Sequence, residues 1–204
     1  MSFGDARGMK VAVVAHCILN QNTVVRGLAS HPGAVAGLAK LLIDLGYGIV
    51  QLPCPETAYA GLRRWWASRE QYDNEAYREF SRAILEPTVK VLRELRRAGC
   101  RIALIGVRGS PSCALKITTS NPSWGGRPAE DELPRSTKVE GPGVFMEELK
   151  RMMEERGIGA PDLELDVDHE EIARAGVPEE VASALRSLAE GRRQGDNDQG
   201  GAEG

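Results

Sequence analysis

The sequence has no long hydrophobic segment. None of its 204 residues belongs to a continuous apolar run of the roughly 20 residues that a membrane-spanning helix requires. Residues 1–8 also lack the apolar core of a secretory signal peptide. We therefore expect a cytoplasmic protein that makes no membrane contact. Thiols stay reduced in that compartment, so the four cysteines are better candidates for metal ligands, catalytic groups or buried thiols than for disulfides.

The sequence also lacks an excess of basic residues. Lys and Arg total 26 against 29 Asp and Glu, which gives a net charge of −3 and a pI of about 5.7. A nucleic-acid-binding surface normally needs a basic patch, whereas the basic residues here are interleaved with acidic ones. We therefore predict a small-molecule substrate and no nucleic-acid partner.

Two common short motifs are missing as well. No two cysteines are spaced as Cys-x-x-Cys, which excludes the local zinc-ribbon and thioredoxin patterns. Neither Gly106-Val-Arg-Gly109 nor Gly141-Pro-Gly143 matches the G-x-G-x-x-G fingerprint of a dinucleotide site. The sequence therefore predicts no bound dinucleotide.

Hydrophobic residues make up 42% of the chain, which is enough to form the core of one domain of ordinary size. We predict an N-terminal extension over residues 1–9, a single α/β domain over 10–190, and a disordered tail over 191–204. The tail has no apolar content to bury.

Short apolar, β-branched runs alternate with segments in which apolar residues recur every three or four positions. This alternation predicts a Rossmann- or flavodoxin-like three-layer fold around a mostly parallel sheet of about four strands. The long helix around 74–98 contains Pro87, where we expect a kink or break, and we expect its Phe80, Ile84, Val91 and Leu95 to face inward. The predicted strands are 10–15, 48–52, 101–107 and, at an edge, 163–167; the predicted helices are 33–45, 74–98, 144–156, 170–175 and 178–190.

Two connecting segments have a distinctive composition. Residues 118–138 are rich in Ser, Pro, Gly and charge without periodicity, which predicts an irregular lid or binding loop. Pro53 and Pro55 surround Cys54 and predict a turn that continues neither as strand nor as helix.

Three cysteines each follow a different predicted strand. Cys17, Cys54 and Cys113 come after the runs 10–15, 48–52 and 101–107, in polar or Pro/Gly-containing turns. The carboxyl ends of parallel strands lie at one edge of the sheet, where ligands of such folds bind. We therefore expect the three thiols to meet there. They can hold a zinc ion with one open position or an iron–sulfur cluster, or one can serve as the nucleophile of a hydrolase. Cys100 fits a buried structural thiol.

Three motifs resemble those of the thiouracil desulfidase family, and most closely those of a related branch of it. They are Ala15-His-Cys-Ile-Leu-Asn-Gln-Asn22, Gln51-Leu-Pro-Cys-Pro-Glu56 and Gly109-Ser-Pro-Ser-Cys113. The similarity extends over about residues 10–157 and includes Arg64-Trp65 and Gln71-Tyr72. It implies a [4Fe-4S] cluster with three cysteine ligands, Cys17, Cys54 and Cys113, and one open iron. The implied reaction removes sulfur from a thiolated nucleobase or similar compound, which passes to the free iron without net redox chemistry.

Further residues are candidates for catalysis or substrate binding. Glu56 can exchange protons with the substrate or with water, a role that the resemblance supports, although it can also be a helix N-terminal charge. Ser110 and Ser112 can donate to the substrate or simply form the Ser-Pro turn, and the resemblance favours Ser110. Asn20, Asn22, Arg64 and Trp65 are candidates for lining the pocket, although an aromatic stripe such as Trp65-Trp66 more often belongs to a core or to a homodimer interface.

Overall fold

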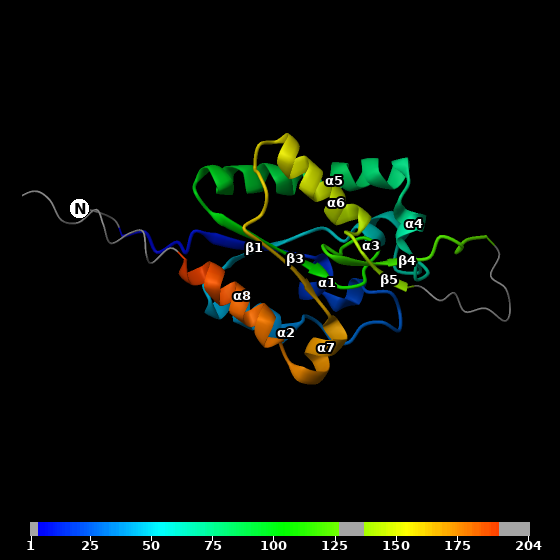
Figure 1. Ribbon diagram of the computed structural model, residues 1–204, viewed down its shortest axis with the longest axis horizontal. Helices are drawn as coiled ribbons and strands as arrows, with labels where there is room; N and C mark the ends of the chain where they lie inside the picture. The colour runs from blue at the N-terminus through cyan, green and yellow to red at the C-terminus, as the bar shows by residue number, and fades with distance from the viewer. Residues whose placement is uncertain (1–3, 127–136, 192–204) are drawn as a thin grey trace, which may run out of the picture.

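The computed structural model of the chain describes residues 4–126 and 137–191 (Figure 1). Residues 127–136, inside the predicted lid, and residues 192–204, nearly all of the predicted tail, lie outside the described part.

A four-stranded parallel sheet with the strand order β2-β1-β3-β6 forms the centre of the fold. All four predicted strands are present, and the predicted edge position of the last one is confirmed. Because the chain leaves β1 toward β2 and then crosses back to β3, the strand order reverses between β1 and β3. That position is the topological switch point where α/β folds bind ligands. The strands are β1 (Lys10–Val14), β2 (Gly48–Gln51), β3 (Arg101–Val107) and β6 (Leu163–Val167).

Helices cover both faces of this sheet, so the predicted Rossmann- or flavodoxin-like α/β class is confirmed. Helices α5 and α6 pack together on one face, and α2, α7 and α8 lie on the other (Figure 1). The Tyr47 hydroxyl donates 2.8 Å to the Leu185 carbonyl and so ties the start of β2 to α8. The five longer helices are α2 (Ala36–Asp44), α5 (Glu75–Arg97), α6 (Val144–Glu155), α7 (His169–Ala175) and α8 (Glu179–Glu190).

The hydrophobic core lies between the sheet and these helices. Ala12, Val13 and Val14 of β1 and the central residues of β3 are fully buried because both faces of the sheet are covered. Phe145, Leu149, Met152 and Met153 of α6 are buried, as the sequence predicts. The rigid ends of these central strands carry the residues of the candidate site.

The long helix lacks a break at Pro87, one of the two predicted outcomes there, and its buried face differs from the predicted one. It continues through Pro87 without a break, because Leu85, Val89 and Leu92 on its buried face hold both halves against the sheet while Pro87 is exposed. The buried face is also shifted by about one residue from the predicted one. Val91, predicted to face inward, is 52% exposed, and Tyr77, Leu85 and Leu92 are buried instead.

The segment predicted to be irregular over 118–138 contains a β-hairpin-like pair. Strands β4 (Ile117–Ser120) and β5 (Thr137–Glu140) pair antiparallel, with Ile117 opposite Glu140. Each strand has only four residues, and 16 residues separate their inner ends. The sequence pattern therefore could not reveal the pairing. No lid is evident from the residues described here.

Short helices follow the first two strands. The prediction that Pro53 and Pro55 prevent a helix is wrong, because α3 (Pro55–Ala60) begins at Pro55. Proline suits the first helical position, where the backbone N–H has no intrahelical partner and φ is already helical. The other short helices are α1 (His16–Leu19), the 3₁₀ turn η1 (Gln21–Thr23) and α4 (Arg69–Tyr72).

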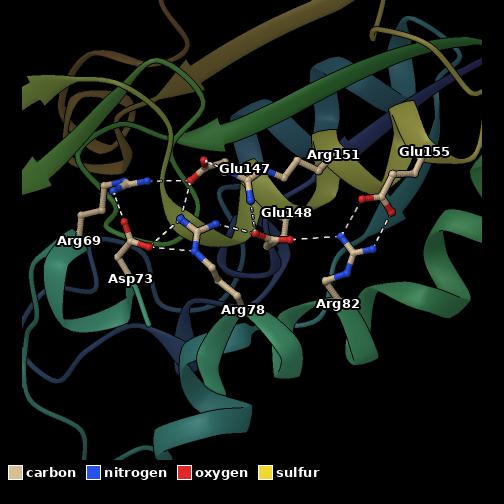
Figure 2. Close-up of polar contacts among 8 residues, drawn as sticks. All are labelled: Arg69, Asp73, Arg78, Arg82, Glu147, Glu148, Arg151 and Glu155. Atoms are coloured by element: carbon tan, nitrogen blue, oxygen red, sulfur yellow. Dashed lines mark hydrogen bonds and ion pairs between the residues drawn. The ribbon is translucent and has the colours of Figure 1, made fainter. Parts of the chain in front are cut away.

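An ion-pair network joins α4 and α5 to α6 (Figure 2). Arg78 donates to Glu147 at 3.0 Å and to Glu148 at 2.5 Å, and the Glu148 side chain is only 3% exposed. Arg69 donates to Glu147 at 2.7 Å and to the Pro142 carbonyl at 3.1 Å. These contacts fix the amino end of α6, which packs against the turn that carries Cys113.

Among the helices within residues 4–126 and 137–191, none combines the length and apolar character needed to cross a membrane.

Candidate active site

The three cysteines lie at the carboxyl ends of three adjacent strands. Cys17 is in the first turn after β1, Cys54 immediately precedes α3 after β2, and Cys113 lies in the turn after β3. Because β2, β1 and β3 are neighbours in the sheet, all three thiols are at one edge, and Cys17 and Cys113 border the switch point. Cys100 lies at the opposite end of β3, buried in the core.

The thiols interact electrostatically with one another. Burial, together with the nearby Cys54 and Glu56, raises the pKa of the Cys17 thiol to about 12. Burial also raises the pKa of Cys113 well above its usual value, reinforced by Cys17, Glu56 and Cys54. By themselves these two thiols are protonated near neutral pH and are poor nucleophiles. A cation bound among them would stabilise the thiolate forms.

Cys54 is held by the start of α3. Its sulfur accepts a hydrogen bond from the Thr57 N–H at 3.4 Å and lies 3.3 Å from the Thr57 hydroxyl. This is the position of a helix N-cap, which a sulfur atom here fills in place of the usual side-chain oxygen. The first turn of α3 therefore fixes Cys54 and also carries Glu56.

Glu56 connects the second cysteine motif to the third. One carboxylate oxygen, Oε1, accepts a 2.7 Å hydrogen bond from the Ser112 hydroxyl, and Oε2 accepts a 2.9 Å bond from Arg64 Nε. The side chains of Glu56 and Arg64 are 13% and 5% exposed. Arg64 also donates 2.7 Å to the Thr23 carbonyl, so it links Glu56 to the loop after Cys17. The ion pair thus contacts segments from two of the cysteine loops.

The two candidate serines have different contacts. Ser112 is fully buried and donates to Glu56, whereas Ser110 is partly exposed. The Ser110 hydroxyl oxygen accepts from the Cys113 N–H at 2.9 Å and from the Ser112 N–H at 3.3 Å. Ser110 therefore shapes the cysteine turn, and its own hydroxyl proton is left to donate elsewhere.

The amino end of α6 packs directly on the Cys113 turn. The N–H groups of Phe145 and Met146 donate to the Ser112 carbonyl at 3.0 and 3.1 Å. A Cβ atom at Gly143 would lie 2.4 Å from the Ser112 carbonyl carbon and 2.8 Å from the Cys113 nitrogen. Glycine is therefore required at residue 143 because two backbone segments touch there.

Two buried tyrosines near the site were not predicted as functional residues. The rings of Tyr72 and Tyr77 are 4.6 Å apart, and both side chains are buried. Burial raises the pKa of the Tyr72 phenol, and the Glu56 carboxylate raises it further. The only signal in the sequence was Gln71-Tyr72, which belongs to the family resemblance.

The remaining candidates make local contacts or are exposed. Asn20 Oδ1 accepts from the Asn22 N–H and amide at 3.2 and 2.9 Å, which caps the η1 turn. Trp65 is 89% exposed, while Trp66 contacts Trp124 edge-on at 5.2 Å. The His16 ring lies 3.0 Å from the Leu52 carbonyl and so joins the ends of β1 and β2.

The described residues contain no group of three His, Cys, Asp or Glu side chains that converges closely enough to hold one metal ion.

Comparisons with known proteins identify the family of this chain. An uncharacterized protein of Methanocaldococcus jannaschii is 42% identical over 107 residues, which cover 52% of this chain and 69% of the archaeal protein. No solved structure matches the chain. The family model described as "Putative 2-thiouracil desulfurase" matches residues 9–140, a range that includes all three cysteines, Glu56 and both serines. The chain belongs to this 2-thiouracil desulfurase family.

Proposed function

We propose that the protein is a desulfidase that uses a [4Fe-4S] cluster to remove sulfur from a thiolated nucleobase or a similar thiolated heterocycle. The observation that carries this proposal is the bond between Glu56 and Ser112 beside three thiols on adjacent strand ends. It combines a proton-transfer group with the ligand set of a cluster at the switch point of the fold.

The donor set fits an iron–sulfur cluster. Cys17, Cys54 and Cys113 are all thiols, the side chains that hold such clusters, and they come from three separate loops. Neighbouring thiols and Glu56 raise the pKa of Cys17 and Cys113. This is expected where acidic groups gather around a site for a positively charged group that would offset their charges. When bound, the cluster would supply a Lewis-acidic iron that accepts the departing sulfur.

The net reaction exchanges sulfur for oxygen at one carbon. Water forms a C–O bond to the thiocarbonyl carbon, the C–S bond breaks, and the sulfur leaves as hydrosulfide, with no change in overall redox state. The Glu56 carboxylate accepts the proton that water loses. A carboxylate has about four acceptor positions, so its bonds to Ser112 and Arg64 leave room for a water molecule.

Arg64 and the serines prepare this base and the substrate. Arg64 orients Glu56 through the 2.9 Å Nε–Oε2 contact, and so acts through Glu56 and not on the substrate directly. Ser112 fixes the other carboxylate oxygen. Ser110, with its hydroxyl proton free to donate, contacts the substrate heteroatom.

The raised pKa values of Cys17 and Cys113 make these two thiols poor candidates for the nucleophile of a cysteine hydrolase. Such an enzyme needs a thiol with a lowered pKa, usually beside a histidine or a helix N-terminus. Cys17 and Cys113 have the opposite shift, and the His16 ring contacts the Leu52 carbonyl. A non-catalytic cluster protein would need the cysteines but would be indifferent to Glu56.

The test is anaerobic purification followed by iron and sulfide analysis, a visible spectrum and an assay of sulfide release from 2-thiouracil and related thiolated bases. We expect about four irons per chain and broad absorbance near ~400 nm. Glu56→Gln should keep the spectrum and lose roughly 100-fold or more of the sulfide release.

The matched control is Glu75→Gln, since Glu75 is also in the first turn of a helix but is exposed. It should behave as wild type. A chain that binds no iron under these conditions would overturn the cluster. Full sulfide release by Glu56→Gln would overturn the role of Glu56.

A further inference from the structure

The carboxyl end of β6 reaches the same edge of the sheet as the three cysteines. β6 pairs with β3 through the register Gly106–Asp166 and Val107–Val167, so Asp166 lies beside the strand end that leads to Cys113. α7 begins at His169, two residues after β6 ends. Both residues lie beyond residues 9–140, the part that matches the family model.

Asp166 binds the loop that follows Cys113. Its Oδ1 accepts from the Leu115 N–H at 2.7 Å, and its Oδ2 accepts from the N–H groups of Lys116 and Ile117 at 2.8 and 3.0 Å. Three consecutive backbone donors on one carboxylate fix the conformation of this loop. The contact begins two residues after the cysteine.

The same loop passes closely over β3. The Cys113 carbonyl accepts from the Val107 N–H at 2.9 Å, and a Cβ atom at Gly106 would lie 2.5 Å from that carbonyl oxygen and 2.6 Å from Asp166 Oδ1. Asp166, Gly106 and the Cys113 backbone are therefore in direct contact. A change at Asp166 is transmitted to Cys113 without an intervening flexible segment.

A second contact connects α7 to the Cys17 loop. The Gln21 side-chain amide donates to the Cys17 carbonyl at 2.8 Å and lies 2.8 Å from His169 Nδ1. Gln21 is 2% exposed and His169 is 8% exposed. Gln21 Oε1 accepts from the Ser30 N–H at 3.2 Å, so the whole amide is used.

The direction of this contact fixes the protonation of the ring. Because the Gln21 amide nitrogen is a donor, His169 Nδ1 has to accept, and a neutral ring then carries its proton on Nε2. Within the described residues, Nε2 is buried and has no hydrogen-bond partner. A buried polar atom without a partner calls for an explanation. For Nε2 of His169, the explanation is that Nδ1 on the same ring serves as the acceptor for Gln21.

We propose that the carboxyl end of β6 sets the positions of two of the three thiols, with Asp166 as the positioning residue for Cys113 and His169, through Gln21, as the positioning residue for Cys17. The contribution to cluster binding rests on the proposed function, but the positions of the thiols do not. Cys54 has no part in this arrangement, because α3 holds it.

The test measures the alkylation rate of each cysteine by iodoacetamide and mass spectrometry, on the full chain purified with a chelator and a reductant. Asp166→Asn places an amide donor against backbone donors and should accelerate alkylation of Cys113 about tenfold or more, with Cys17 and Cys54 unchanged. His169→Leu removes the acceptor for Gln21 and should accelerate Cys17 to a similar degree, with Cys113 unchanged.

Two variants separate positioning from general loss of stability. Asp162→Asn alters an aspartate that, like Asp166, accepts from the backbone, here from the Ile102 N–H of β3 at 2.7 Å, but at the opposite end of the sheet. It should leave all three rates unchanged. His169→Asn keeps an acceptor near the Nδ1 position and should restore the slow rate of Cys17. The proposal would be overturned if Asp166→Asn and His169→Leu both accelerated the alkylation of all three cysteines equally. It would also be overturned if neither variant changed any alkylation rate.

Iron content of the anaerobically purified variants then distinguishes this inference from the proposed function. If wild type binds a cluster, Asp166→Asn and His169→Leu should retain less iron than Asp162→Asn. If wild type binds no iron but the cysteine-specific rates change as described, the proposed function fails and the positioning role holds.

Discussion

The Ser112 hydroxyl donates a 2.7 Å hydrogen bond to Glu56 Oε1, although 56 residues separate them in the chain. Glu56 lies in the first turn after Cys54, and Ser112 immediately precedes Cys113. The bond therefore connects two cysteine loops as well as two candidate catalytic groups. Arg64 occupies the other carboxylate oxygen and extends the connection to the third loop through Thr23.

The two serines should give different kinetic phenotypes. Ser112→Ala removes a hydrogen bond to a charged group and should lower kcat for sulfide release by roughly 10- to 100-fold with little change in KM. Ser110→Ala removes the proposed substrate contact and the acceptor for the Cys113 N–H, and should raise KM and lower stability by about 1 kcal/mol. Steady-state kinetics and urea unfolding check these outcomes. The reverse assignment of kcat and KM effects would exchange the two roles.

Arg64→Met should destabilise the protein by roughly 3–5 kcal/mol, because it leaves the buried Glu56 carboxylate without its ion pair. The Thr23 carbonyl would lose one of its two donors at the same time and keep the Thr57 hydroxyl. The measurement is urea unfolding at pH 7. Arg63→Met is the matched control, since Arg63 is the neighbouring residue and is exposed. It should change stability by less than about 0.5 kcal/mol.

Gly143→Ala and Gly37→Ala should shift stability in opposite directions. At Gly143 the backbone φ of −72° suits any residue, but a methyl group would overlap the Ser112 and Cys113 backbone, so we expect a loss of about 1–3 kcal/mol or more. Gly37 is inside α2, where a Cβ would meet only Val177 at an ordinary 3.5 Å. Alanine there should add about 0.5–1 kcal/mol. Thermal unfolding of both variants measures these changes in stability. Similar changes for Gly143→Ala and Gly37→Ala would contradict the close contact between Gly143 and the Ser112 and Cys113 backbone.

Stability should fall below pH 6.5 because of His169. Burial and, to a smaller extent, His31 lower the pKa of His169 to about 4, although Asp168 acts in the opposite direction. In the unfolded chain this histidine has a pKa of about 6.5, so between pH 6.5 and 4 the unfolded chain binds a proton that the folded chain does not bind. The free energy of unfolding therefore decreases as the pH falls from 6.5 to 4. The loss should reach roughly 2–3 kcal/mol.

The measurement is urea unfolding of wild type and His169→Asn at several pH values between 7 and 4. The difference in stability between the two proteins should shrink toward acid pH, because only wild type has the titrating ring. A difference that is constant over this range would contradict the prediction.

Much of the fold was predictable from local pattern. The runs 10–15 and 101–107 are apolar and β-branched because both of their faces are covered, and that pattern cannot form an exposed strand. Alternation with helices then implied a parallel sheet with the cysteines at one edge. The β4–β5 pair could not be predicted, since two four-residue strands leave no periodicity to detect. Pro55 was misinterpreted because the same residue ends one element and begins the next.

The candidate site, like the fold, was predictable from the sequence only in part. The sequence by itself determined which residues follow the strands, namely Cys17, Cys54 and Cys113, with Glu56 and the serines beside them, because strand ends and turns are local features. Only the tertiary structure decided that Glu56 binds Ser112 and Arg64. Only it brought Asp166 and His169 to the loops of Cys113 and Cys17. Apart from Glu56 and Arg64, which are eight positions apart, these contacts join residues more than 50 positions apart, as for Asp166 and Leu115 at 51. They follow from the order of strands in the sheet, which no local pattern encodes.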